Sequence, residues 1–227
     1  MSAHAPPASP AAVLFDLDGT LVDSERDNVE SVVLAVRRLG KELDAEDRQF
    51  VIGHSWNEIH ARIVRRHGLT LSMPALIASA VCEKRALLAQ KGYQALPGAV
   101  AAVKRLGRRS QLAVVSGASR VEVEDAVVSL GVRADFAFLL GAEDYARGKP
   151  HPEPSQMAMH RFAVEPGACI VIEDATPGIL AGRAAGARVV AVRAGNFSGY
   201  DLSAAHAIVD TLDQITDELC AGLLREA

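Results

Sequence analysis

The chain has 227 residues, a formal net charge of −4 at pH 7, 49 % hydrophobic and 23 % charged residues. This size and composition suit a globular protein with one domain and a sizeable insertion, or with two small domains. The acidic balance without a basic stripe excludes nucleic acid as an expected partner, and no apolar run is long enough for a membrane span.

The first ten residues, 1–10, are rich in Ala, Pro and Ser and lack both the basic and the apolar region of a signal peptide. They predict a disordered leader. The cysteines Cys82, Cys169 and Cys220 lie far apart and form no metal-ligand or redox spacing. Scattered cysteines favour free thiols in a reducing compartment, so we expect a cytoplasmic protein.

Short apolar runs recur along the chain and predict strands that are buried on both faces of a parallel sheet. They cover residues 11–15, 111–115, 136–140, 169–172, 188–192 and, more weakly, 207–209. Helical stretches lie between these runs. The alternation predicts an α/β fold with a doubly wound, mainly parallel, Rossmann-like sheet.

Helix starts are marked by capping residues. A capping box at 119–122 begins a helix that ends near Gly131, and Thr-Pro at 176–177 supplies an N-cap followed by proline at the first helical position. A further capping box is predicted at 211–214.

The stretch 24–93 breaks the alternation, because it has helical periodicity and no convincing strand. Apolar residues from Val29 to Leu39 line one helical face, and a further helix is predicted over 73–90. We therefore expect an all-helical domain over 24–93, inserted into a Rossmann-like core formed by 11–23 and 94–227.

Two carboxylates, Asp16 and Asp18, directly follow the first predicted strand, at the sheet edge where open α/β sheets place their chemistry. Gly19 then allows a sharp turn. Two like charges about 4 Å apart repel by roughly 4 kcal/mol at an effective dielectric constant near 20. A cation or a proton must therefore neutralise the pair.

Three further polar clusters follow later strands. Ser116-Gly117 combines a hydroxyl with backbone N–H groups near a helix start, which can bind an anion. Lys149 brings one positive charge in a Gly-Lys-Pro-His-Pro loop, and Glu173-Asp174 precede the helix start at 176–177. Each cluster alone fits a turn, a solvated loop or a favourable charge at a helix dipole. Their order at successive strand ends indicates one site.

With these motifs in this order, the sequence resembles the haloacid dehalogenase superfamily over nearly its whole length. The first motif of that superfamily, DxDGT, is matched by residues 16–20, and the later motifs are matched by Ser116, Lys149 and the pair Glu173-Asp174. The helical insertion resembles the α-helical cap of its phosphoglycolate phosphatase and β-phosphoglucomutase branch.

The resemblance implies a phosphatase mechanism at these positions. Asp16 is the expected nucleophile, which forms an aspartyl-phosphate, and Asp18 is the expected general acid and base. Mg²⁺ is expected on the Asp16 carboxylate, the Asp18 backbone carbonyl and Asp174, with Glu173 assisting directly or through water.

The resemblance also implies how the phosphoryl group is held. Ser116, the backbone N–H groups around Gly117 and Lys149 are expected to bind the phosphoryl oxygens. Thr20 is expected to hydrogen-bond near Asp16 and to steady its orientation.

The expected reaction is hydrolysis of a small phosphorylated metabolite, a sugar phosphate or a phosphoglycolate-like acid. Mutases of this branch resemble one another in a cap-loop Ser-Arg and in a His near the first motif, whereas this chain has Ser55-Trp56 and Asn28 there. A phosphosugar mutase is therefore the alternative enzyme. A non-catalytic binding or regulatory protein with a relic site is the alternative from another class, and a phosphoacceptor signalling domain is a third.

Substrate selection is expected from the cap-loop residues His54, Ser55 and Trp56. The structural alternative is that Trp56 packs in the helical core and that Ser55 only caps its helix. The expected assembly is a monomer or a small homo-oligomer, with no nucleic acid or membrane partner.

Overall fold

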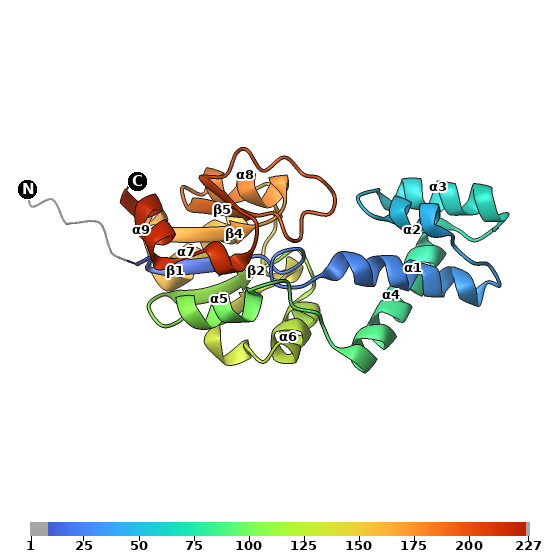
Figure 1. Cartoon of the computed structure of the whole chain (residues 1–227), viewed down its shortest axis with the longest axis horizontal. Coiled ribbons are helices and arrows are strands. Elements are labelled where there is room, and N and C mark those ends of the chain that lie inside the picture. Colours follow the sequence, from blue (N-terminus) through green and yellow to red (C-terminus); the bar gives the residue numbers. More distant parts are fainter. Residues whose placement is uncertain (1–8, 226–227) are drawn as a thin grey trace, which may run out of the picture. The chain divides into compact units, whose positions relative to one another are not determined.

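The structure, a computed structural model, describes residues 9–225 (Figure 1). Most of the predicted leader 1–10 therefore lies outside the described residues. Of its described part, Pro10 is buried, and its carbonyl accepts a hydrogen bond from Ser110 Oγ at 2.7 Å. The strands form one six-stranded parallel sheet in the order β3-β2-β1-β4-β5-β6. They are β1 Ala12–Phe15, β2 Gln111–Val115, β3 Phe138–Leu140, β4 Cys169–Glu173, β5 Arg188–Val192 and β6 Ala207–Val209.

The helices of the chain lie before, between and after these strands. They are α1 Ser24–Arg38, α2 Ala45–Val51, α3 Trp56–His67, α4 Met73–Lys91, α5 Ala99–Leu106, α6 Arg120–Ser129, α7 Glu153–Phe162, α8 Thr176–Ala184 and α9 Asp217–Arg225. Within residues 9–225, no helix combines the length and the apolar character needed to cross a membrane.

The apolar runs form buried strands, as the sequence predicts. All residues of β1 and β4 are buried, because both faces of the sheet are covered by helices. On one face, Leu14 of β1 and Val171 of β4 belong to the same apolar cluster as Met159 of α7 and Ile179 of α8. From β1 the chain adds β2 and β3 on one side, and then β4, β5 and β6 on the other side. With right-handed connections this reversal places the later crossover helices, α7 and α8, on the face with this cluster. The predicted doubly wound α/β fold is confirmed.

Two local predictions about helix starts need correction. Thr211 makes no capping hydrogen bond with its side chain, so the predicted box at 211–214 is wrong. The Gln214 side chain instead accepts from the backbone N–H of Asp210 at 2.6 Å and closes a turn, and α9 begins only at Asp217. At α8 the N-cap is Ala175, one residue before the predicted Thr176.

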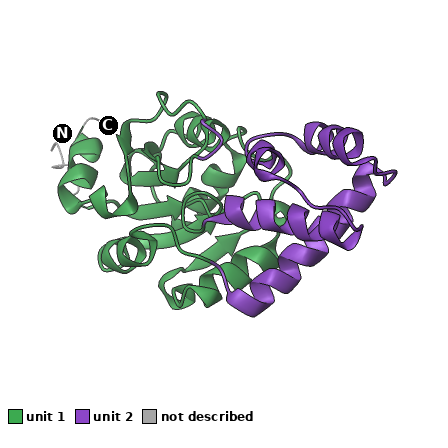
Figure 2. Cartoon of the chain, turned by 45° about the vertical axis from the view of Figure 1, so that its right-hand side comes forward, with its two compact units in different colours: residues 1–22, 94–196, 200–227 green, residues 23–93, 197–199 purple. Residues whose placement is uncertain are grey.

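The chain divides into two compact units (Figure 2). Unit 1 contains the sheet and comprises residues up to 22, 94–196 and from 200 onward, whereas unit 2 comprises 23–93 and 197–199. The insertion 23–93 leaves and re-enters unit 1 at one place, because Val22 pairs with Ala95 in an antiparallel bridge and Leu96 N–H donates to the Leu21 carbonyl at 3.0 Å.

Unit 2 is a helical domain with its own apolar core. Its buried residues come mainly from the inner faces of α1, α3 and α4, and they include Val32, Val36, Ile63 and Leu76. The short helix α2 is not predicted from the sequence.

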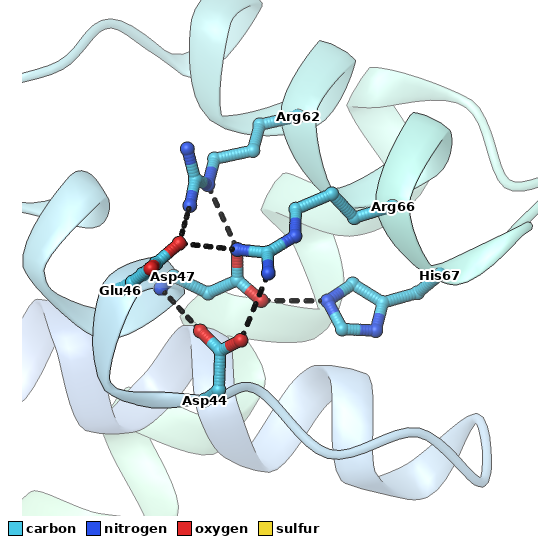
Figure 3. A network of polar contacts seen from close by, with 6 residues as sticks. All are labelled: Asp44, Glu46, Asp47, Arg62, Arg66 and His67. Atoms are coloured by element: carbon cyan, nitrogen blue, oxygen red, sulfur yellow. Dashed lines mark hydrogen bonds and ion pairs between the residues drawn. The ribbon is translucent and has the colours of Figure 1, made fainter.

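An ion-pair network around Asp47 joins α2 to α3 (Figure 3). The Asp47 side chain is 1 % exposed, and its Oδ1 accepts from Arg62 Nε and Arg66 Nη1, each at 2.8 Å. His67 Nε2 lies 2.7 Å from Oδ2. Burial alone would raise the pKa of Asp47, but the bonds from Arg62 and His67 and the charge of Arg66 lower it on balance. The buried carboxylate is therefore held ionised.

Candidate active site

The carboxyl ends of β1, β2 and β4 bring together most of the site residues that the sequence predicts in unit 1. β1 lies between β2 and β4, and Phe15 is in register with a residue of each neighbour. Asp16 follows Phe15, and its backbone N–H donates to the Ile172 carbonyl at 3.0 Å. This register sets Asp16 beside the ends of the two neighbouring strands, where Ser116 and Glu173 stand.

Lys149 links these strand ends through its ammonium group. Its Nζ donates to Asp16 Oδ1 at 2.6 Å, to the Val115 carbonyl at 2.9 Å and to Glu173 Oε1. The lysine side chain is 14 % exposed, so these bonds form away from bulk water and are weakly screened. The single predicted cation therefore lies among the predicted acids.

Three carboxylates gather at this edge. Asp16, Glu173 and Asp174 each offer an oxygen, and these oxygens all lie within 4.8 Å of one another. The three residues are 9 %, 2 % and 7 % exposed, respectively. Thr20 Oγ1 donates to Asp174 Oδ1 at 3.4 Å, within the carboxylate cluster that includes Asp16, and its role in steadying Asp16 stays a prediction. A Cβ on Gly19 would lie 2.2 Å from Asp174 Oδ2, so only glycine fits there.

Asp18 lies two residues beyond Asp16 in the same turn. It is half-buried, and its backbone forms a bridge with Val22. Its carboxylate is not one of the three that gather among the described residues. The roles of Asp18 as general acid and base, and as a metal ligand through its backbone carbonyl, stay predictions.

Burial makes this crowding of negative charge costly. Burial is the main cause of a raised pKa at Asp16; Lys149 opposes the rise and the charge of Glu173 adds to it. Burial likewise raises the pKa of Asp174, and the charges of Asp16 and Glu173 raise it further. Burial disfavours the charged form of Lys149, but the two carboxylates raise its pKa on balance. One ammonium cannot balance three carboxylates, so the site favours a further cation.

The donor set suits a hard divalent cation. Magnesium prefers carboxylate and carbonyl oxygens and keeps several waters, and no sulfur or imidazole ligand belongs to this cluster. Glu173 is already engaged at both oxygens, because Oε2 accepts from the backbone N–H groups of Asp174 and Ala175 at 3.2 and 3.4 Å while Oε1 meets Lys149. Asp16 and Asp174 are therefore the carboxylates better placed to bind a metal directly.

Ser116 and Gly117 form a turn between β2 and α6. Ser116 is 1 % exposed, and its Oγ accepts from the Ala118 N–H at 3.0 Å. A capping box of Ser119 with Glu122 then starts α6, as predicted. A Cβ on Gly117 would meet no atom within 4 Å, so the backbone there faces open space. The hydroxyl, the turn and the helix start lie together at the end of β2.

The predicted specificity residues His54, Ser55 and Trp56 lie in unit 2. The Ser55 side chain forms a capping box with Glu58 at the start of α3. The His54 ring stacks on Phe50 with ring centroids 3.8 Å apart, and Trp56 packs against the helical core. Ser55 and Trp56 thus have the structural roles that the sequence analysis gives as the alternative, and their role toward substrate stays a prediction.

Two positions that shape the site are not found by sequence reasoning. A Cβ on Gly178 of α8 would lie 1.7 Å from Glu173 Oε1, so this glycine makes room for the carboxylate. Glu153, at the start of α7, accepts from the Ala146 N–H at 2.7 Å and from Arg147 Nε at 3.1 Å, which closes the loop before Lys149. The signal for Gly178 is a glycine in the first turn of the helix after the acidic pair.

Comparison with known proteins identifies the family. Residues 13–192 match the model of the haloacid dehalogenase-like hydrolases. The chain belongs to this family. The predicted resemblance is therefore confirmed, and it covers both sides of the helical insertion.

Several curated relatives are phosphatases. The chain is 33 % identical over 190 residues to validoxylamine A 7'-phosphate phosphatase of Streptomyces hygroscopicus subsp. limoneus, covering 76 % of this chain and 81 % of that protein. It is 30 % identical over 183 residues to fructose-1-phosphate phosphatase of Escherichia coli K12, covering 81 % and 96 %. It is 30 % identical over 192 residues to the bifunctional riboflavin kinase/FMN phosphatase of Arabidopsis thaliana, but spans only 48 % of that protein.

Solved structures share the fold. A haloacid dehalogenase-superfamily hydrolase from Geobacter sulfurreducens aligns with a TM-score of 0.78 at 21 % identity, covering 96 % of this chain and 100 % of that one. β-Phosphoglucomutase from Clostridium difficile aligns with a TM-score of 0.68 at 24 % identity, covering 96 % and 98 %. The family and its phosphatase members assign this chain to the phosphoric monoester hydrolases.

Proposed function

We propose that the protein is a Mg²⁺-dependent phosphatase that hydrolyses a small phosphorylated metabolite through an aspartyl-phosphate on Asp16. The contact of Lys149 Nζ with Asp16 and Glu173, beside Asp174, is the observation that carries the proposal. This contact keeps a buried carboxylate close to fixed positive charge, at an edge of the sheet where a phosphate can approach.

In this mechanism a carboxylate oxygen of Asp16 attacks the phosphorus, and the bond from phosphorus to the ester oxygen breaks. Asp18 gives its proton to the leaving oxygen, so the product departs as an alcohol. The ionised Asp18 then takes a proton from a water that attacks the aspartyl-phosphate. The acyl-phosphate bond breaks, inorganic phosphate leaves, and both aspartates return to their starting states.

Other residues hold charge during these steps. Lys149 opposes the effect of burial on Asp16, which favours the ionised nucleophile, and its ammonium can then face the phosphoryl oxygens. Ser116 Oγ already accepts from the Ala118 N–H, which leaves its own proton to donate to a phosphoryl oxygen. The Gly117 N–H supplies a second donor.

Mg²⁺ would be held by the carboxylates of Asp16 and Asp174 and by the Asp18 carbonyl, with Glu173 acting through water and through Lys149. When bound, the ion would supply the positive charge that the cluster lacks and would stabilise negative charge on the phosphoryl group.

The substrate class follows from the relatives and from the insertion. Named relatives are phosphatases of validoxylamine A 7'-phosphate, fructose 1-phosphate and phosphoglycolate, which supports a sugar phosphate or a phosphoglycolate-like acid for this chain. We infer that unit 2 acts as the cap and that His54, Ser55 and Trp56 contribute to substrate choice. Asn28 and Trp56, in place of the expected mutase residues, favour water over a sugar as the phosphoryl acceptor.

The three free thiols support a reducing, cytoplasmic location.

A phosphate-release screen tests the proposal. The protein is incubated with hexose phosphates, hexitol phosphates and phosphoglycolate, in Mg²⁺ and in EDTA. We expect phosphate release that EDTA abolishes and added Mg²⁺ restores. Asp16→Asn should abolish release, while Asp210→Asn, at an exposed ion pair with Arg193, should leave it unchanged. Normal turnover by Asp16→Asn would refute the nucleophile assignment.

The same screen separates the alternative functions. Conversion of a hexose 1-phosphate to its 6-phosphate, with little free phosphate, would assign the chain as a mutase. A flat Mg²⁺ titration together with no release from any substrate would favour a non-catalytic binding protein.

A further inference from the structure

The turn after β2 directs its backbone carbonyls toward one downstream segment, residues 142–149. The Val115 carbonyl accepts from Lys149 Nζ at 2.9 Å, and the Ser116 carbonyl accepts from Tyr145 Oη at 2.8 Å. The Ala118 carbonyl accepts from the Ala142 N–H at 2.8 Å. These carbonyls therefore have fixed directions, each set by a different donor.

The direction of the Ser116 carbonyl also fixes the direction of the next N–H group. In a trans peptide the C=O of one residue and the N–H of the next lie in the same plane and point in opposite directions. When Tyr145 holds the Ser116 carbonyl, the Gly117 N–H must point away from the Tyr145 hydroxyl. Among residues 9–225, no acceptor is recorded for this N–H, and the space beside Gly117 is open.

Tyr145 is itself held in place on a well-anchored segment. Asp144 Oδ2 accepts from the Gly141 N–H at 2.9 Å, and both its oxygens lie 2.8 Å from Arg120 Nη1. The Tyr145 ring lies 3.5 Å from the position that a Cβ on Gly148 would take. The hydroxyl is therefore carried by an anchored segment of backbone, and it holds the carbonyl that it binds at 2.8 Å.

We propose that Tyr145 is a positioning residue: its hydroxyl, by holding the Ser116 carbonyl, aims the Gly117 N–H at a phosphoryl oxygen of the substrate. The inference rests on the proposed phosphatase function and adds to it a residue that touches no substrate atom. A freely rotating Ser116–Gly117 peptide would have to be ordered each time phosphate binds, at a cost in affinity.

The variant Tyr145→Phe tests the inference, because it removes one oxygen and keeps the ring. The matched control is Ser110→Ala, which removes another hydroxyl-to-carbonyl bond, from Ser110 Oγ to Pro10, just before β2 begins. Affinity for inorganic phosphate is measured by calorimetry on the Mg²⁺-loaded protein, alongside kcat, KM and thermal unfolding.

We expect Tyr145→Phe to weaken phosphate binding and to raise KM by about 5- to 10-fold, as for one lost hydrogen-bond donor, with a smaller change in kcat. The Gly117 N–H contacts the phosphoryl group before and after its transfer, so binding of substrate and of product phosphate should change together. Ser110→Ala should leave both affinities unchanged, although it should lower the unfolding temperature at least as much as Tyr145→Phe does.

Two results overturn the inference while leaving the phosphatase proposal standing. One is an active Tyr145→Phe with unchanged KM and phosphate affinity. The other is a loss of affinity that Ser110→Ala shares, which would make it an effect of general stability. Failure of the phosphatase proposal looks different: the unaltered protein would then release no phosphate from any substrate in the screen.

Discussion

Replacing Gly178 by alanine sets a local gain in helix propensity against a steric conflict inside the site. Gly178 lies in the first turn of α8, where alanine is favoured over glycine by up to about 1 kcal/mol. The added Cβ would lie 1.7 Å from Glu173 Oε1 and 1.9 Å from its carboxyl carbon, far inside contact distance. The carboxylate must therefore move.

The cost of that movement follows from the contacts of Glu173. The side chain is 2 % exposed, and its oxygens bind Lys149 and two backbone N–H groups. Hydrogen bonds to a charged group contribute about 1.5–3 kcal/mol each. Losing one or two of them outweighs the propensity gain, so we expect a net destabilisation of about 1–4 kcal/mol. A displaced Glu173 also releases Lys149, so kcat/KM should fall about 10- to 100-fold.

Gly222→Ala is the matched control. Gly222 lies within α9, and beyond its chain neighbours and the helix backbone the nearest atom to an added Cβ is Arg225 Nη2 at 3.9 Å. This variant should be stabilised by about 0.5–1 kcal/mol with unchanged turnover. Both variants are compared by thermal unfolding and by phosphate release. If Gly178→Ala is stabilised like Gly222→Ala and keeps its kcat/KM, Glu173 is not held as argued here.

Three other predictions concern charge in the two units. Asp47→Asn should lower the free energy of unfolding of unit 2 by about 2 kcal/mol, because Arg62 and Arg66 lose their shared buried partner. The control Glu46→Gln, at an exposed neighbour, should lower it by under about 0.5 kcal/mol. Urea unfolding followed by the fluorescence of Trp56, the chain's only tryptophan, measures both losses, and equal losses would contradict the network's role. Because folding lowers the pKa of Asp47, its contribution is present above its ordinary value of 3.8 and is lost as pH falls through the lower folded value, so the advantage over Asp47→Asn should shrink in acid titrations followed by the same signal. Lys149→Met should reduce turnover at least about 100-fold. It should also enlarge the rise in unfolding temperature that Mg²⁺ produces, since the ion becomes the only counter-charge to Asp16 and Glu173. An unchanged rise would mean that Lys149 and the ion do not share the same carboxylates.

The sheet could be predicted from the sequence because its signal is local. Continuous apolar runs such as 169–172 have few alternatives to a buried strand, and the structure has β4 there. The start of β3 is less well predicted: the run from Phe136 gives a strand only from Phe138, because Phe136 ends the 3-10 helix Arg133–Asp135 and its N–H donates to the Arg133 carbonyl at 3.4 Å. Its ring packs edge-on against Phe15, with ring centroids 5.9 Å apart. The helix α2 is short and mostly polar, so neither its length nor its periodicity distinguishes it from a loop.

The candidate site is predictable where the sequence order of the strands fixes it. Asp16, Ser116 and Glu173 all follow strands, and parallel strands end at the same edge, so their proximity follows from topology. The contact from Tyr145 to the Ser116 carbonyl cannot be predicted in this way, because it joins two loops through one side-chain hydroxyl. The close approach of Gly178 to Glu173 likewise depends on how α8 packs on the sheet. Such contacts depend on tertiary packing, which no local pattern records.

The bridge between Val22 and Ala95 makes the helical insertion interchangeable. Its two ends leave and rejoin the sheet side by side, with Leu96 bonded to Leu21 at 3.0 Å, so the sheet needs no particular length or shape from the intervening chain. A different helical module could be grafted between these two points without altering the strand order or the distances among Asp16, Lys149 and Glu173. If the insertion contributes to substrate choice as proposed, exchanging it would change the substrate while the residues at the strand ends stay in place.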